Sequence, residues 1–214
     1  MMAKRTPEEE QQRLLAMLEY ENEYRAKGYR QIAGVDEAGR GPLAGPVFAA
    51  AVILPENLMI PGIDDSKKLS GKKREALFDV ITERAAAYAV YSVDEKTIDE
   101  INILNATFQA MNGAVGQLGA RPDFVLIDGN QIRGMTIPHK TIVKGDAKSM
   151  SIAAASILAK VSRDRYMDKM AALYPAYGFE QHKGYGTKAH TQAILAHGPC
   201  PIHRQTFLKK LLEK

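Results

Sequence analysis

The stretch that indicates the fold most directly spans residues 32–47 and reads Ile-Ala-Gly-Val-Asp-Glu-Ala-Gly-Arg-Gly-Pro-Leu-Ala-Gly-Pro-Val. Its apolar beginning predicts a strand that ends on two adjacent carboxylates, Asp36 and Glu37. A Gly-Arg-Gly turn at residues 39–41 follows at once. Carboxylates at a strand end, next to a backbone that a ligand can approach closely, indicate metal-assisted chemistry on a phosphate-bearing substrate.

The composition is that of an ordinary globular protein, with 45% hydrophobic and 25% charged residues in a chain of 214. No apolar run approaches the roughly 18 residues that span a bilayer, and the first ten residues lack the apolar core of a secretory signal. The single cysteine, Cys200, excludes an internal disulfide framework. We therefore expect a cytoplasmic protein that does not bind membranes, and we expect a monomer because nothing in the sequence demands a partner subunit. The net charge of +4 permits a polyanionic partner.

Hydrophobic patterning along the whole chain predicts an α/β fold with a mixed five-stranded sheet flanked by helices. The segment at residues 46–54 is nearly all apolar, so both of its faces should be covered. The expected strands are residues 31–36, 46–54, 88–93, 124–128 and 136–143. The expected helices are residues 7–27, 70–87, 96–118, 149–172, 188–197 and 204–213.

The two ends of the chain are predicted to be helical. Residues 1–30 form an N-terminal helical extension, which we expect to pack on the main body; a regulatory or substrate-gripping arm is the alternative. Residues 31–214 form the principal domain and close with a helical segment. Its last helix carries apolar residues among lysines and should dock on the domain, with a sliding-clamp motif as the alternative.

Acidic residues end or follow several of the predicted elements. Asp128 ends the strand at residues 124–128, and Asp146 directly precedes a helix. If this strand neighbours the one that carries Asp36 and Glu37, the four acids converge, because ligands of α/β sheets gather at strand ends. Four hard oxygen donors without His or Cys suit Mg²⁺ or Mn²⁺. The alternative is that each acid is a loop cap or a solvated charge.

An ordered set of motifs spans about residues 31–200. The first motif is Gly34-Val-Asp-Glu-Ala-Gly-Arg-Gly-Pro-Leu-Ala-Gly-Pro-Val47. The others, in order, are Asp65-Ser-Lys-Lys-Leu69, Ile101-Asn-Ile-Leu104, Asp128-Gly129, Lys144-Gly-Asp146, Ser151-Ile-Ala-Ala-Ala-Ser-Ile157, Arg163-Asp164 and His182-Lys-Gly-Tyr-Gly-Thr187. This ordered set resembles the bacterial ribonuclease HII family.

This resemblance implies a ribonuclease H-like fold and an endonuclease that cuts the RNA of RNA–DNA hybrids. It also implies cleavage at single ribonucleotides in duplex DNA, leaving 3′-hydroxyl and 5′-phosphate ends, with two divalent metal ions. Such an activity belongs to DNA replication and repair. The residues that match the family's metal-binding acids are Asp36, Glu37, Asp128 and Asp146. Those that match its ribonucleotide-sensing loop and its junction-stacking tyrosine are Gly39, Arg40, Gly41 and Tyr185.

Elementary chemistry agrees with these roles. Only the 2′-hydroxyl distinguishes a ribonucleotide within DNA, and glycines let backbone groups reach it. Arg40 can hold a phosphate, and Tyr185 between two glycines can stack on a sugar or base. The alternatives are a plain tight turn and a tyrosine packed under a loop.

Further substrate contacts are expected from basic and capping residues near the site loops. Lys67 and Lys144 belong to local basic groups that suit a phosphate track, although solvated helix faces would look the same. Ser149 is expected to cap the following helix and to bind substrate. His182 and His190 lack metal-ligand spacing, so we expect them to make surface or phosphate contacts.

Two other functions fit parts of the sequence. One is a related metal nuclease, such as a junction resolvase, that acts on DNA alone; the Gly-Arg-Gly turn with Tyr185 argues against it. The other is a nucleic-acid-binding module without catalysis. Four acids facing phosphates would weaken such binding, so the sequence favours the nuclease.

Overall fold

A computed structural model describes residues 6–213. Residues 1–5 and Lys214 lie outside the described residues. Residues 1–5 begin both the expected N-terminal extension and the ten-residue stretch in which no secretory signal is predicted. The fold is a five-stranded mixed sheet in the order β3-β2-β1-β4-β5, which confirms the predicted α/β class. The strands are β1 (Ile32–Ala38), β2 (Val47–Ile53), β3 (Ala87–Val93), β4 (Phe124–Asp128) and β5 (His139–Ile142).

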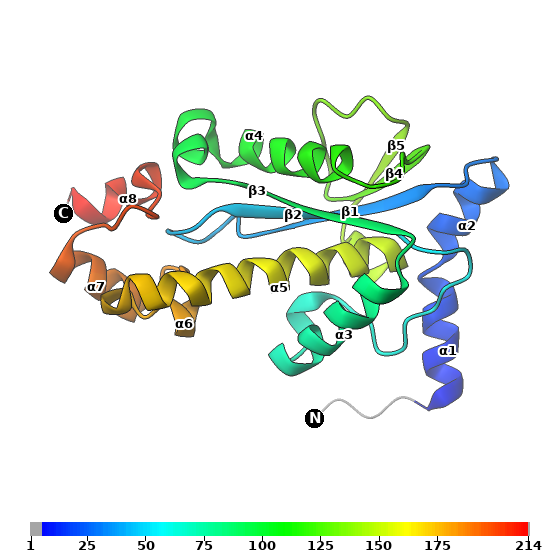
Figure 1. Cartoon of the computed structure of the whole chain (residues 1–214), viewed down its shortest axis with the longest axis horizontal. Coiled ribbons are helices and arrows are strands. Elements are labelled where there is room, and N and C mark those ends of the chain that lie inside the picture. The colour runs from blue at the N-terminus through cyan, green and yellow to red at the C-terminus, as the bar shows by residue number, and fades with distance from the viewer. Residues whose placement is uncertain (1–5, 214) are drawn as a thin grey trace.

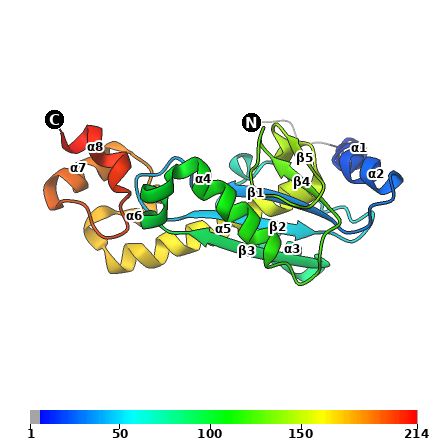
Figure 2. The same cartoon turned by 90° about the horizontal axis from the view of Figure 1, so that it is seen from above.

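Helices cover both faces of this sheet and both of its ends. Figure 1 shows α4 on one face and α5 with α3 on the other, while α1 and α2 lie at one end and α7 and α8 at the opposite end; Figure 2 shows the same arrangement from above. The helices are α1 (Pro7–Ala16), α2 (Glu19–Ala26), α3 (Gly71–Arg84), α4 (Glu95–Gly116), α5 (Met150–Leu173), α6 (Phe179–His182), α7 (Lys188–His197) and α8 (Gln205–Leu212). Among the helices of residues 6–213, none is both long and apolar enough to cross a bilayer.

Three predicted elements differ from the structure. The single helix expected at residues 7–27 is wrong, because α1 and α2 are separated at Met17 and Leu18. These two side chains are buried against α5, and the Met17 carbonyl accepts a hydrogen bond from Met150 N–H at 2.8 Å. The helix expected at residues 96–118 is interrupted at Asn102, which has φ of 65°. Strand β5 begins after Pro138 rather than at Thr136, since proline offers no donor to a ladder.

The N-terminal helices pack on the main body. Leu14, Met17 and Leu18 join the apolar cluster that α3 and α5 form against the sheet. Buried Glu21 of α2 accepts hydrogen bonds from Ser149 and Ser151 at the start of α5. The division of the chain at residue 30 remains a proposal.

Helix α5 lies unusually close to β1, and this close approach positions the sheet edge that carries the acids. A Cβ on Gly34 would fall 2.5 Å from the carbonyl oxygen of Ser151, and closer still to the adjoining backbone atoms. Ala153, Ala154 and Ala155 are fully buried at the same interface. The small side chains therefore let α5 pack close to the sheet, and β2 is buried along its whole length as predicted.

The C-terminal segment docks through a cluster that contains two buried histidines. Leu208 of α8 is fully buried, which confirms the docked terminal helix. His190 is also fully buried, and its Nε2 lies 3.0 Å from His203 Nε2. The surface contact expected for His190 is therefore wrong, because its ring packs between His182 and Phe179.

Acid is expected to destabilise the protein through these histidines. Burial lowers the pKa of His190 to about 4 and also lowers the pKa of His203. An unfolded histidine takes up its proton near pH 6.5. Between about pH 6.5 and pH 4 the unfolded chain therefore binds more protons than the folded one, so the free energy of unfolding falls as pH falls.

Urea unfolding at pH 7 and at pH 5 measures this effect. Carboxylates also contribute to the pH dependence of unfolding in this range. The His190→Gln variant is therefore the reference, because it removes the contribution of this histidine alone. We expect a shallower pH dependence in this variant than in the unaltered chain. Equal slopes in the two proteins would contradict the role assigned to His190.

Candidate active site

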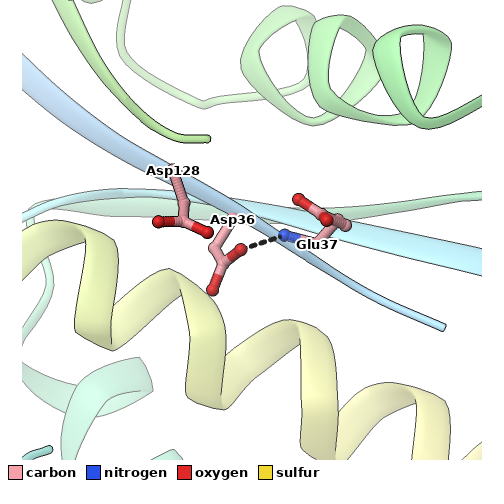
Figure 3. Close-up of side chains that lie close together, drawn as sticks. All are labelled: Asp36, Glu37 and Asp128. Carbon is pink, nitrogen blue, oxygen red and sulfur yellow. Dashed lines mark hydrogen bonds between the residues drawn. The ribbon is translucent and has the colours of Figure 1, made fainter. Parts of the chain in front are cut away.

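Three carboxylates meet where β1 and β4 end. The two strands run parallel, with Val35 opposite Ile127, so that the residues that follow, Asp36 and Asp128, are neighbours. Together with Glu37 they offer one oxygen each, all within 4.8 Å of one another (Figure 3). Asp36 points towards α5 and accepts a hydrogen bond from Glu37 N–H at 2.7 Å. The predicted convergence of the two strand ends is thereby confirmed.

The electrostatics of this cluster favour a bound cation. Burial raises the pKa of Asp36 well above its usual value, and the charges of Glu37 and Asp128 raise it further. Burial also raises the pKa of Glu37, while Arg40 at 3.4 Å opposes that shift. Crowded carboxylates of this kind take up protons unless positive charge neutralises them. An all-oxygen donor set fits hard divalent ions such as Mg²⁺ or Mn²⁺.

Asp146 lies beside the three-residue group rather than within it. It is buried in the short 3₁₀ turn at Gly145–Ala147, and burial, followed by the charges of Asp65 and Asp128, raises its pKa to about 6. The Gly145 N–H donates to Asp128 Oδ1 at 2.6 Å and so ties this turn to the cluster. Lys67 Nζ lies 3.9 Å from Asp146 Oδ2. The fourth predicted acid is thus adjacent to the other three.

A groove runs from Glu37 of the acid cluster past the Gly-Arg-Gly turn. The Tyr185 side chain is 45% exposed, and a Cβ on Gly41 would lie 3.8 Å from its ring. The groove therefore unites most of the residues predicted to contact substrate. The residues that line it are Glu37, Ala38, Gly39, Arg40, Gly41, Ser66, Lys67, Ser156, Lys160 and Tyr185.

Two predicted substrate contacts are not part of this groove. Lys144 is exposed in a left-handed conformation, with φ of 58°, at the start of the turn that holds Asp146. Ser149 is fully buried, and its hydroxyl donates to Glu21 at 2.7 Å and accepts from Ile152 N–H. The capping role expected of Ser149 is confirmed, whereas its substrate contact is wrong because no face of the side chain is open.

Two buried arginines beneath the Gly-Arg-Gly turn were not identified as functional residues from the sequence. Arg163 donates to the carbonyl oxygens of Ala44, Pro46 and Lys183. Arg204 donates to the carbonyl oxygens of residues 39, 40 and 45. Arg163 interrupts the otherwise apolar, buried face of its helix, and this interruption could have marked it as a functional residue. Arg204 follows a histidine in a short connection, where no sequence pattern marks it.

A protein-family model described as Ribonuclease HII matches residues 33–210. The chain belongs to the ribonuclease HII family. A Ribonuclease HII of Caldicellulosiruptor saccharolyticus is 59% identical over 194 residues, covering 91% of this chain and 95% of that protein. One from Bacillus mycoides is 53% identical over 213 residues, covering 99% and 82%. The resemblance seen in the sequence motifs is thereby confirmed.

Solved structures agree with this membership. The ribonuclease H2 of Pyrococcus horikoshii superposes with a TM-score of 0.71 at 28% identity, covering 86% of this chain and 98% of that one. The ribonuclease H-like fold expected from the motifs is therefore confirmed. As a member of the ribonuclease HII family, the chain is an enzyme, a nuclease that hydrolyses phosphodiester bonds.

Proposed function

We propose that this member of the ribonuclease HII family hydrolyses the RNA strand of RNA–DNA hybrids and cuts 5′ of single ribonucleotides in duplex DNA, leaving 3′-hydroxyl and 5′-phosphate ends. The observation that carries the proposal is the shared groove: Glu37 of the acid cluster lines it together with the Gly39–Gly41 turn and Tyr185. A strand held by the turn would therefore pass over the acids. Such an activity would serve DNA replication and repair in the cytoplasm.

The acid cluster is the proposed metal centre. Asp36, Glu37 and Asp128 would hold the ions, with Asp146 beside them, and either Mg²⁺ or Mn²⁺ fits the oxygen donors. Two bound ions would activate a water molecule and stabilise the leaving oxygen of the phosphodiester. Asp36 is held in place by Glu37 N–H, and Asp128 by Gly145 N–H, so neither carboxylate depends on the metal for its orientation.

Recognition of the ribonucleotide is assigned to the turn and the tyrosine. The backbone of Gly39–Gly41 can approach a 2′-hydroxyl because Gly41 has no Cβ to block it. Arg40, which pairs with Glu37 and is about half exposed, would bind a phosphate beside the cut. Tyr185 would stack on the sugar or base next to the junction. Exposed Lys67 and Lys144 would contact phosphates further along the strand.

The proposal predicts strong selection for one ribonucleotide. A DNA duplex containing a single ribonucleotide should be cut on its 5′ side roughly 10⁴-fold faster than the same all-DNA duplex, because a site built to bind a hydroxyl rejects the analogue that lacks it by about this factor. The measurement is cleavage mapping on end-labelled duplexes, with Mg²⁺ and Mn²⁺ supplied in turn.

The same experiment distinguishes the other candidate functions. Equal cutting of the two duplexes would replace the ribonuclease proposal with a DNA-directed metal nuclease. Binding of both duplexes without cleavage under either metal would indicate a module without catalysis. A cut on the 3′ side of the ribonucleotide would keep the substrate class and overturn the proposed register.

A further inference from the structure

Arg204 is a fully buried cation whose partners are carbonyl oxygens of the Gly-Arg-Gly turn and of Gly45. Its guanidinium donates to Gly39 O at 2.6 Å, to Arg40 O at 2.9 Å and to Gly45 O at 2.9 and 2.7 Å. Within residues 6–213 it makes no ion pair with a carboxylate. Burial lowers its pKa to about 9, so it stays charged at neutral pH. A buried charge of this kind is tolerated only when its donors are satisfied, and here the turn and Gly45 supply the acceptors.

These hydrogen bonds fix the direction of two successive peptide groups. In a trans peptide the C=O of one residue and the N–H of the next point in opposite directions. Because the carbonyls of Gly39 and Arg40 face the buried Arg204, the N–H groups of Arg40 and Gly41 point away from it. Arg40 and Gly41 are exposed, and their N–H groups have no acceptor within residues 6–213. The turn therefore presents two adjacent backbone donors on its open side, where it lines the groove.

We propose that Arg204 is a positioning residue for ribonucleotide recognition, which aims the Arg40 and Gly41 N–H groups at the 2′-oxygen of the substrate. The inference rests on the proposed function, since it concerns how the same turn reads the substrate. It also gives the C-terminal segment a role: Arg204 directly precedes α8, and the ring of Phe207 lies 5.0 Å beneath the guanidinium.

Arg163 supports the same turn from another side. Its guanidinium passes directly under Gly39, where any Cβ would overlap its Nε and Cδ atoms, and the φ of +98° at this position also favours glycine. Its acceptors are the carbonyls of Ala44, Pro46 and Lys183 rather than those of Gly39 and Arg40. Arg163 therefore anchors the segment that follows the turn and the loop that precedes Tyr185, while the orientation of the two peptides within the turn depends on Arg204.

The Arg204→Lys variant tests whether Arg204 orients the two peptide groups of the turn. Lysine keeps the charge but lacks the planar fork that reaches three carbonyls at once. The measurement is the ratio of the dissociation constants for an all-DNA duplex and for the same duplex with one ribonucleotide, taken in EDTA so that no strand is cut. Two oriented hydrogen bonds should give the unaltered chain a ratio of about 10 or more. We expect Arg204→Lys to bring the ratio within about twofold of one while the all-DNA constant changes less than about twofold.

A matched control separates positioning from general damage. Arg13→Lys makes the same replacement at a guanidinium of α1 that donates to the Ile63 carbonyl. Helix α1 lies at the opposite end of the molecule from α8, which Arg204 directly precedes (Figure 1). Arg13→Lys should leave the ratio unchanged. An unaltered ratio in Arg204→Lys, or equal weakening of both duplexes, would overturn the inference. A ratio of one in the unaltered chain would instead show that the proposed function itself fails.

If Arg204→Lys does not fold, the Phe207→Leu variant decides the question. This change leaves Arg204 and its acceptors in place, keeps an apolar side chain against the cluster that Phe207 joins, and removes the aromatic face beneath the guanidinium. A folded Phe207→Leu protein, checked by circular dichroism, should show a ratio about two- to threefold below that of the unaltered chain. A ratio equal to that of the unaltered chain would refute the role of Arg204.

Discussion

Asp128→Asn is expected to lower the rate of phosphodiester cleavage by roughly 10³-fold or more. Asp128 contributes one of the three carboxylates that meet within 4.8 Å, and a metal centre supplies several kcal/mol of transition-state stabilisation. The fold should persist, because the asparagine side-chain oxygen can still accept the hydrogen bond from Gly145 N–H. Binding of the hybrid should stay similar or become tighter, because one negative charge near the phosphates is removed.

Single-turnover kinetics measure the cleavage rate, and fluorescence anisotropy measures binding, on the same labelled duplex. Asp79→Asn is the matched control: the same chemical change at an exposed acid of α3, away from the three-carboxylate cluster, should alter neither quantity. Cleavage by Asp128→Asn at the rate of the unaltered chain would remove the metal-centre proposal. Loss of binding together with cleavage would mean that the substitution had damaged the groove instead.

The acid cluster was predictable because its determinants are local. One apolar run ends at Val35 and another begins at Phe124, and these runs indicate two buried strands. Each strand ends on an acid, and this pattern does not depend on the rest of the chain. Their parallel pairing then follows from the general behaviour of α/β sheets and was confirmed. The sequence predicted that Asp146 would join the other acids, but not that it would lie beside the three-carboxylate group rather than within it, since that distance depends on the turn before α5.

The features that were missed depend on contacts between distant segments. The break between α1 and α2 places Met17 and Leu18 against α5. Because this contact is made with a distant segment, helical periodicity alone predicted one continuous helix through these residues. Ser149 carried the signature of a cap, but the Glu21 that buries it comes from α2. Arg204 reaches Gly39 across 165 positions of sequence, and an isolated arginine in a connection resembles an ordinary surface charge.

Gly34→Ala is expected to lower the free energy of unfolding by about 3 kcal/mol or more, because the added methyl group overpacks a rigid interface. The added Cβ would fall 2.5 Å from the Ser151 carbonyl oxygen, and its nearest neighbours are all backbone atoms that cannot rotate aside. Strand β1 cannot retreat, since Gly34 is paired with Val52 on one side and with Leu126 on the other. The strain must therefore be relieved by moving the start of α5.

Urea unfolding followed by circular dichroism measures this loss, with Gly116→Ala as the matched control. A Cβ at Gly116, the last residue of α4, meets nothing within 4 Å, so alanine there should be neutral or stabilising by up to about 1 kcal/mol. Cleavage should fall as well, because α5 carries Ser156, which lines the groove, and its start adjoins the turn that holds Asp146. A Gly34→Ala protein as stable as the unaltered chain would show that α5 can shift without cost. The close contact would then not be what fixes α5 against the acid-bearing strand.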